Sequence, residues 1–458
     1  MEAIKEQLEK QRRFFEEGHT RSLKARKEQL RLMRKLLKEN EQAILEALYA
    51  DLKKPGMEAY SSEIGFMYAE ISEALDELDL WASRESVSTP FIHWPARSYI
   101  LREPLGQVLV IGAWNYPIML CLAPALSALA AGNCVVLKPS EMAPASSALL
   151  QKLVSQYFKP EWMLVVEGDG STVIPALVQL HRFNYLFFTG SERIGRAVYK
   201  LAAEHLIPVT LELGGKSPCI VDETAAVRTS AKRIAWAKFW NAGQTCVAPD
   251  YVVVHESILE EFLKETQSAI EAFFGKVPEE SDSYAAILNV RRLEQLERLA
   301  NSAKSMTDVR INRNNLSLSP VIQLNPPIES LVMQEEIFGP IMPVFSYRDK
   351  QELDTFFKAH PNPLAVYVFS RSTRFIEHIE QRYAFGGGVI NNVMIHLANP
   401  KLPFGGVGSS GFGQYHGRYG FETFSHRKSI TRTSFWPDIP VRYAPYKRWF
   451  NLVKKLMG

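Results

Sequence analysis

Short apolar runs alternate with helical segments between residues 107 and 213, and this alternation limits the fold more than any other feature of the sequence. The apolar runs cover residues 107–112, 134–138, 162–167, 183–189 and 207–213. Segments of helical character lie between them, at 118–131, 145–158, 172–180 and 191–205. Apolar runs of this length between helices are typical of parallel strands that helices cover on both faces. We therefore expect a parallel sheet covered by helices on both faces.

A second region of mixed helices and strands follows Gly214 and Gly215. Helices are expected at 226–241, 258–274 and 290–305, with strands at 251–255, near Val321 and Met342, and at 364–370. The first fifty residues are highly charged and carry an apolar stripe at helical spacing, which predicts surface helices. The fold class is thus α/β with two sheets.

The stretch between Glu103 and Lys138 contains no charged residue and is long enough to cross a bilayer. Gly112, Pro117 and Pro124 interrupt it, however. Its helical part, 118–131, suits a buried core helix better, so no membrane-spanning segment is expected.

Charge and cysteine content exclude several classes of protein. The 458 residues include 53 Lys and Arg and 50 Asp and Glu, and a net charge of +3 is too small for a dedicated nucleic-acid binder. The four cysteines show no C-x-x-C spacing, which indicates a reducing compartment and no metal site. Because the charged N-terminus lacks the apolar core of a signal peptide, a cytoplasmic protein is expected.

Two residues are candidates for catalysis. Cys246 lies in a Gly-containing turn before an apolar strand, where a thiolate can be both accessible and flanked by free backbone N–H groups. Glu212 ends the apolar run 207–213, at the edge where open α/β sheets bind ligands, and a carboxylate there can act as a general base. Spacing alone leaves an inert loop cysteine and a solvated strand-end glutamate as alternatives.

Two further strand ends suggest a nucleotide site. Gly190, Ser191 and Gly195 lie where a strand passes into a helix, and the N–H groups of such a turn can bind an anion. Lys138 and Glu141 follow another strand of the same sheet. The first segment departs from G-x-G-x-x-G, so a plain strand-to-helix turn is the alternative.

Seven ordered motifs together make the whole chain resemble the aldehyde dehydrogenase superfamily. They are AWNYP (113–117), LKPSE (137–141), FTGS (188–191), LELGGKSP (211–218), GQTC (243–246), EEIFGP (335–340) and LPFGGVG (402–408). The endings YHG (415–417) and FETFSH (421–426) resemble its class 3 branch, which includes fatty and aromatic aldehyde dehydrogenases.

The resemblance implies a reaction and a role for each candidate. Cys246 would attack the aldehyde carbonyl, and the Asn115 amide with the Cys246 N–H would hold the oxyanion of the thiohemiacetal. After hydride transfer to the nicotinamide, a water deprotonated by Glu212 would hydrolyse the thioester to a carboxylic acid. The expected substrate is a medium- or long-chain aliphatic aldehyde or an aromatic one.

The resemblance also implies residues that bind the cofactor. Lys138 and Glu141 would contact the adenosine ribose, the segment from Gly190 through Ser191 to Gly195 the pyrophosphate, and Glu336 with Phe338 the nicotinamide ribose and ring. Glu141 would repel a 2′-phosphate, which favours NAD over NADP, whereas Lys138 works against that preference.

Family architecture implies a division of the chain into four parts. Residues 1–80 and 102–210 would form a Rossmann-type NAD(P)-binding domain with a parallel sheet, and residues 211–420 an α/β catalytic domain. Residues 81–101 with 421–440 would form a β-strand oligomerisation arm, whose exposed strand edges a second subunit pairs to give a homodimer. Residues 441–458 predict an amphipathic helix, with Trp449, Leu452, Val453 and Leu456 on one face. It could dock on its own protein, cover the substrate entrance or make a peripheral membrane contact.

Two other functions remain open from the sequence. A CoA-acylating aldehyde dehydrogenase would pass the thioester to a thiol, although Glu212 favours water. A catalytically silent homologue with a structural or binding role would not need Cys246, Glu212 and Asn115 together.

Overall fold

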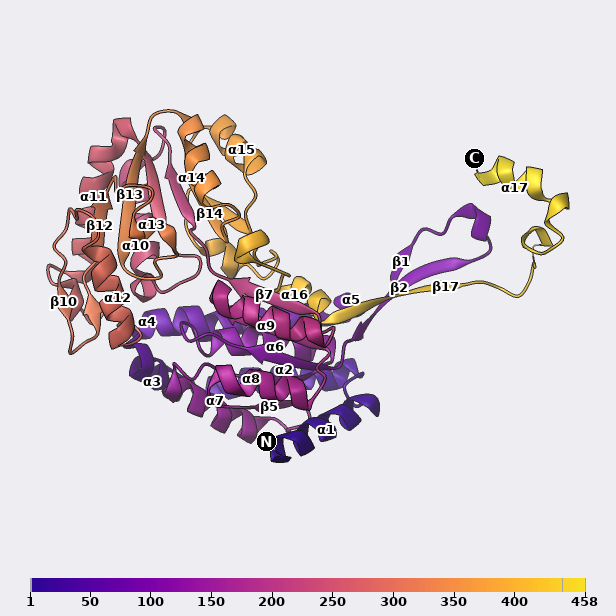
Figure 1. Cartoon of the computed structure of the whole chain (residues 1–458). Helices are drawn as coiled ribbons and strands as arrows, with labels where there is room; N and C mark the ends of the chain where they lie inside the picture. Colours follow the sequence, from indigo (N-terminus) through magenta and orange to yellow (C-terminus); the bar gives the residue numbers. More distant parts are fainter. Residues whose placement is uncertain (1, 439, 458) are drawn as a thin grey trace.

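The computed structural model describes residues 2–438 and 440–457 and has two sheet-based bodies with a projecting arm (Figure 1). The first body contains a six-stranded sheet in the order β16-β7-β6-β3-β4-β5. Its strands are β3 (Gln107–Ile111), β4 (Cys134–Lys138), β5 (Met163–Val165), β6 (Tyr185–Gly190), β7 (Val209–Leu213) and β16 (Gly411–Phe412). All neighbouring pairs are parallel except β16 and β7. The expected parallel sheet is confirmed.

Alternation along the strands divides the first body into two apolar layers. Successive side chains of a strand point to opposite faces, and Val108 and Val110 of β3 belong to one core cluster whereas Leu109 and Ile111 belong to another. On the first face pack α2 (Leu23–Glu39), α3 (Glu41–Leu52), α5 (Phe66–Trp81), α6 (Met119–Ala131) and α7 (Pro144–Tyr157). On the second pack α1 (Glu2–Glu16), α8 (Gly170–Leu180) and α9 (Glu192–Glu204). Both faces are therefore buried.

The charge-free stretch forms α6, and every residue of this helix is buried. It packs inside the first body, as expected for a core helix. None of the helices in the described ranges is long and apolar enough to cross a membrane.

The second body contains an all-parallel sheet in the order β12-β13-β9-β8-β14-β15. Its strands are β8 (Pro218–Val221), β9 (Tyr251–His255), β12 (Val321–Leu324), β13 (Ile341–Tyr347), β14 (Ala365–Phe369) and β15 (Gly387–Ile390). Its helices are α10 (Val227–Phe239), α11 (Leu259–Phe274), α12 (Val290–Ala300), α13 (Leu331–Gln334), α14 (Leu353–Ala359) and α15 (Thr373–Arg382). A small hairpin pairs β10 (Ile311–Asn312) with β11 (Ser317–Leu318). The second sheet is thus also present as expected.

A three-stranded antiparallel arm leaves the first body (Figure 1). It consists of β1 (Glu85–Val87), β2 (Arg97–Pro104) and β17 (Ser425–Arg432), and α16 (Gly417–Thr423) leads into β17. The tail helix α17 (Phe450–Met457) lies at the far end of this arm, away from both bodies. Of the expected apolar face, Leu452 is exposed, Trp449 and Val453 are half-buried, and the side chain of Leu456 lies outside the described residues. The tail therefore does not dock on the body of its own chain.

Candidate active site

The carboxyl edge of the first sheet faces the amino edge of the second sheet, because only four residues separate β7 from β8. The chain leaves the carboxyl end of β7 and directly enters the amino end of β8, so the carboxyl edge of the first sheet faces the amino edge of the second. Loops after β3, β4, β6 and β7 lie at the first edge, where open α/β sheets bind their ligands. The segment before β9, which contains Cys246, lies at the second.

A left-handed turn presents Cys246. Asn241, Ala242 and Gly243 have φ of 51°, 51° and 75°, a region that Asn tolerates and Gly favours. A Cβ on Gly243 would come within 2.3 Å of the Gly339 carbonyl oxygen. The Cys246 side chain is only partly buried, whereas the other three cysteines are buried, as expected for thiols that act as small apolar groups.

Glu212 lies at the end of β7 and is 4% exposed. Neither of its carboxylate oxygens has a hydrogen-bond partner among the described residues. Burial raises the pKa of Glu212 well above its ordinary value. An unpartnered buried carboxylate with a raised pKa is suited to accept a proton from water. This is the environment expected for a general base, and a solvated strand-end glutamate is excluded.

The structure brings Asn115 to the cysteine turn. Its side-chain amide donates a 3.1 Å hydrogen bond to the carbonyl oxygen of Gln244, two residues before Cys246. Beside it, the hydroxyl groups of Tyr116 and Thr245 lie 2.5 Å apart. The loop after β3 and the turn before β9 are thus joined through their polar groups.

Glu336 completes a cluster around the thiol. Burial, together with the Glu336 and Glu212 carboxylates, raises the pKa of Cys246 to about 12. Burial also raises the pKa of Glu336 to about 8, and Asp250 adds to the effect. The Glu336 carboxylate packs on Gly214, where a Cβ would lie 1.9 Å from Oε2. Glycine is therefore required there for the carboxylate to reach this place.

We expect Glu336→Gln to increase the alkylation rate of Cys246 by iodoacetamide, because removing a neighbouring carboxylate lowers the thiol pKa. The thiolate fraction changes about tenfold per pH unit below the pKa. Since the pKa of Glu336 is about 8, the difference from the parent should widen between about pH 7 and pH 9 as this carboxylate ionises. The exposed neighbour variant Glu335→Gln is the matched control. Equal rates for parent and Glu336→Gln at about pH 9 would contradict this electrostatic coupling.

The expected cofactor residues lie along the carboxyl edge of the first sheet. Lys138 ends β4, and its Nζ lies 2.5 Å from Oε2 of Glu141. The other oxygen of Glu141 accepts a 3.2 Å hydrogen bond from the N–H of Gly170. The Glu141 side chain is nearly half exposed and can therefore exchange these partners for ribose hydroxyl groups.

The turn between β6 and α9 fits a phosphate. Ser191 precedes α9 and makes no side-chain capping bond, so the N–H groups of the first turn are available to an anion. A Cβ on Gly195 would lie 2.6 Å from Leu213, and one on Gly190 would lie 2.7 Å from Phe188. Both glycines therefore permit the close packing of α9 on the sheet.

Phe338 lies nearer the cluster around Cys246 than Lys138, Glu141 and the β6–α9 turn do. It has φ of 46°, and its ring packs edge-on against Trp114, with centroids 5.4 Å apart. The site thus gathers Cys246, Asn115, Glu212, Glu336 and Phe338, with Lys138, Glu141 and the β6–α9 turn along the same sheet edge.

Sequence reasoning missed several polar residues around the cluster. Lys238 is fully buried in α10, and burial lowers its pKa to about 8. Gln244 donates to the carbonyl of Ala286 and accepts from the N–H of Leu288, which fixes the turn before Cys246. A lysine on the apolar side of a helix was the one signal that could have indicated Lys238. Nothing in local spacing points to the partners of Gln244.

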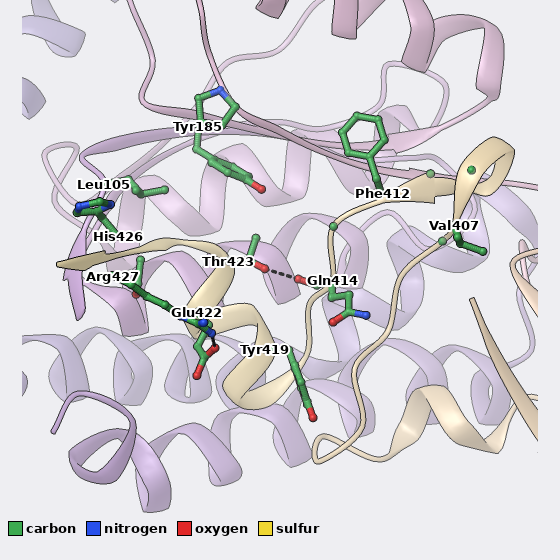
Figure 2. Close-up of a pocket in the computed structure, with 16 residues that line it drawn as sticks. Leu105, Tyr185, Val407, Phe412, Gln414, Tyr419, Glu422, Thr423, His426 and Arg427 are labelled. Atoms are coloured by element: carbon green, nitrogen blue, oxygen red, sulfur yellow. Dashed lines mark hydrogen bonds and ion pairs between the residues drawn. The ribbon is translucent and has the colours of Figure 1, made fainter. Parts of the chain in front are cut away.

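A separate pocket of about 910 Å³ lies beside the glycine-rich segment, α16 and β17 (Figure 2). Leu105, Tyr185, Phe412 and Tyr419 line it, and its rim carries the ion pair between Arg427 and Glu422. None of the predicted catalytic or cofactor residues is among its lining residues. This pocket is therefore separate from the cluster around Cys246.

Comparison with known proteins agrees with this geometry. The model of the aldehyde dehydrogenase family matches residues 1–430. A 4,4′-diaponeurosporen-aldehyde dehydrogenase of Staphylococcus aureus is 41% identical over 456 residues, covering 99% of each chain. A dimeric NADP-preferring aldehyde dehydrogenase of Rattus norvegicus is 40% identical and covers 94% of each chain. The solved substrate-bound structure of Staphylococcus aureus AldH superposes with a TM-score of 0.95, at 40% identity and 99% coverage of both chains.

The resemblance to the class 3 branch is confirmed, since relatives named as aldehyde dehydrogenase family 3 proteins are 38–41% identical over nearly the whole chain. The family uses NAD(P). The chain belongs to the aldehyde dehydrogenase family and is an enzyme that oxidises aldehydes to carboxylic acids.

Proposed function

We propose that Cys246 is the nucleophile of this oxidation and Glu212 the base that hydrolyses its thioester. The observation that carries the proposal is the convergence of a cysteine that is only partly buried, an unpartnered buried carboxylate and the Asn115 amide between the facing edges of the two sheets. The Cys246 thiol loses its proton to water, the sulfur bonds to the aldehyde carbon, and the carbonyl oxygen becomes the oxyanion of a thiohemiacetal. Collapse of this oxyanion would expel hydride from the same carbon, and NAD(P), which Glu336, Phe338 and the β6–α9 turn would hold, would supply the hydride acceptor. The product on the enzyme is a thioester.

Hydrolysis then releases the acid. Glu212 takes a proton from a water molecule whose oxygen attacks the thioester carbon, and the carbon–sulfur bond breaks to return the Cys246 thiolate. The absence of any hydrogen bond to Glu212 from described residues supports this role, because no protein group there competes for the proton-accepting oxygens.

Asn115 is the proposed oxyanion donor. Its amide nitrogen carries two hydrogens, and its hydrogen bond to Gln244 uses one. We expect Asn115→Ala to slow acylation by about a hundredfold or more, the usual effect of losing one oxyanion donor. Rapid-mixing measurement of the first turnover checks this, and Asn115→Asp serves as the matched variant that keeps the shape but removes the donor. A loss below about threefold would contradict the role.

The activity is tested by following NAD(P) reduction with aldehydes, with and without CoA. Reduction without CoA and release of free acid would support the proposal. Dependence on CoA would indicate the acylating alternative, which the position of Glu212 disfavours. No reduction with any aldehyde would indicate a silent homologue.

Apolar aldehydes of medium or long chain, or aromatic ones, are the proposed substrates. Trp236 and Trp240 pack edge-on with centroids 5.2 Å apart, and Trp240 begins the turn that leads to Cys246. Trp236 and Tyr60 are 37% and 39% exposed, which leaves aromatic surface for an apolar chain. The name of the Staphylococcus aureus relative, a diaponeurosporen-aldehyde dehydrogenase, also favours a long apolar aldehyde.

NAD is the proposed preferred cofactor, with NADP as an alternative, because the Glu141 carboxylate would repel a 2′-phosphate. Lys138 and Gly170 lower the pKa of Glu141 against the opposing effect of its burial, which keeps the group charged. We expect Glu141→Gln to raise kcat/KM for NADP relative to NAD by about tenfold. Parent kcat/KM values with the two cofactors are the control. A parent kcat/KM with NADP well above that with NAD would overturn the preference. NADP stays an alternative because the Rattus norvegicus relative is named as NADP-preferring.

The division of labour along the chain is proposed as residues 1–80 and 102–210 for NAD(P) binding, 211–420 for catalysis, and 81–101 with 421–440 for oligomerisation. A homodimer is proposed because β1 and β17 are the edge strands of the arm and can pair with another chain. Light scattering tests the homodimer, and a stable monomer would contradict it.

A cytoplasmic location is proposed because all four cysteines are free. The exposed Phe450 and Leu452 beside Lys454 and Lys455 support a peripheral membrane contact of the tail.

A further inference from the structure

Two oppositely charged side chains are completely buried in the N-terminal segment beside the catalytic loops. Lys54 is 1% exposed and Glu63 is 0% exposed, and neither belongs to a motif that identified the family. Lys54 follows the left-handed residue that ends α3, and Glu63 lies in the π-helix Tyr60–Gly65, which continues α4 (Gly56–Ala59). Burying an ion pair is costly, and π-helical turns often mark functional sites. A role in the catalytic site would explain why this costly pair is buried here.

Lys54 connects the pair to the proposed oxyanion loop. Its Nζ lies 2.6 Å from Oε1 of Glu63 and donates a 2.9 Å hydrogen bond to the backbone carbonyl oxygen of Asn115. The same ammonium lies over the ring of Tyr116, 4.1 Å from its centroid. One cation thus contacts two successive residues of the loop that carries the Asn115 amide.

Glu63 holds the far end of the same loop. Its Oε2 accepts hydrogen bonds of 2.9 and 3.1 Å from the N–H groups of Ile118 and Met119. These are free N–H groups at the start of α6, which a carboxylate satisfies well. The pair therefore fixes residues 115–119 at both ends through hydrogen bonds to backbone atoms, and the Tyr116 ring is a further contact of Lys54.

The cysteine turn contacts the same carbonyl. The Asn241 side chain donates a 3.1 Å hydrogen bond to the Asn115 carbonyl oxygen, which therefore has two donors, one from each side. The N–H of Asn241 in turn donates to Oε2 of the buried Glu58. A shift of the Asn115 backbone would separate its amide from the cysteine turn.

We propose that Lys54 and Glu63 are positioning residues, which hold the Asn115 amide at the place where the oxyanion forms. This inference rests on the proposed role of Asn115. A displacement of about 1 Å in such a donor can cost about a hundredfold in rate. The contribution is geometric, so it should appear in acylation and not in cofactor binding.

The test is a double-mutant cycle of Lys54→Met and Asn115→Ala, measured as the first-turnover rate of the full-length enzyme. We expect Lys54→Met alone to slow acylation about ten- to a hundredfold, with KM for NAD(P) changed less than about twofold. In the Asn115→Ala background the same substitution should cost less than about threefold, because the donor it positions is already absent.

Two variants separate positioning from folding. Lys54→Met leaves the Glu63 carboxylate buried without its partner. The double variant Lys54→Met/Glu63→Gln removes both charges, while the new side-chain amide retains an acceptor oxygen for the α6 N–H groups. Acylation by this double variant should stay slow even where its melting temperature recovers. Arg26→Met is the matched control, since Arg26 is a buried cation bonded to the carbonyls of Thr20 and Ala130, away from the catalytic loops. It should lower the melting temperature without slowing acylation.

The outcomes are distinct. Equal losses from Lys54→Met with and without Asn115 would overturn the positioning role and leave the proposed mechanism intact. Recovery of acylation together with stability in the neutral double variant would overturn it as well. A negligible effect of Asn115→Ala alone would instead remove the proposed oxyanion donor, and the inference with it.

Discussion

Cys246→Ser should abolish aldehyde oxidation almost completely, with a fall in kcat on the order of 10⁴ or more, as when other enzymes lose their nucleophile. A serine hydroxyl has nearly the same shape but is a far weaker nucleophile near neutral pH. No other cysteine can replace the thiol, because Cys121, Cys134 and Cys219 are all buried. The measurement is NAD(P) reduction in the presence of an apolar aldehyde.

Cys134→Ala is the matched control for this prediction. Cys134 begins β4 inside the sheet, and burial raises the pKa of its thiol to about 12. Its replacement removes a buried sulfur without touching the cluster around Cys246, so it should lower stability and leave kcat within about twofold. Acid formation by Cys246→Ser at more than about a tenth of the parent rate would contradict the nucleophilic role of Cys246.

The sheets and the catalytic cluster differ in how far the sequence could predict them. Buried parallel strands are continuous apolar runs, so β3, β4, β6 and β7 could be located to within two residues. Glu212 lies at the carboxyl end of β7 and Cys246 precedes β9, so their places at the sheet edges were predictable from the strands alone. Their meeting across two sheets was not, because it depends on the short connection from β7 to β8.

The residues that support the cluster could not be predicted for a different reason. Lys54 contacts a carbonyl 61 residues away, and Glu58 contacts an N–H 183 residues away. Both partners are backbone groups, which leave no trace in the sequence. A charged residue within or beside a helical segment normally indicates a solvated face, and the burial of the Lys54 and Glu58 side chains becomes visible only in the folded chain.

The tail shows a third kind of limit. Its helix is amphipathic as predicted. An apolar face predicts that this side of the helix is covered, but it does not predict which surface covers it. In the structure α17 lies beyond the arm, and Phe450 is 65% exposed. Which surface covers this face depends on a second chain, a membrane or the substrate entrance.

Glu212→Gln should separate the two half-reactions. Attack by Cys246 and hydride transfer do not need Glu212, so the variant should reduce about one equivalent of NAD(P) per site in a rapid burst. Hydrolysis should then slow by about 10² to 10⁴, the usual contribution of a general base. The acyl-enzyme should accumulate and be visible by mass spectrometry as a covalent adduct on the peptide that contains Cys246.

The pH dependence provides an independent check on this base. Burial without a hydrogen-bond partner raises the pKa of Glu212, so the fraction able to accept a proton, and with it the hydrolysis rate, should rise with pH through that raised value in the parent. In Glu212→Gln this dependence should disappear, because the amide does not titrate. If added CoA restores turnover of Glu212→Gln, which stays slow in water alone, a thiol can cleave the thioester without the Glu212 base. A parent-like steady state without a burst would contradict the assignment, since it would mean that water attacks the thioester without the Glu212 carboxylate.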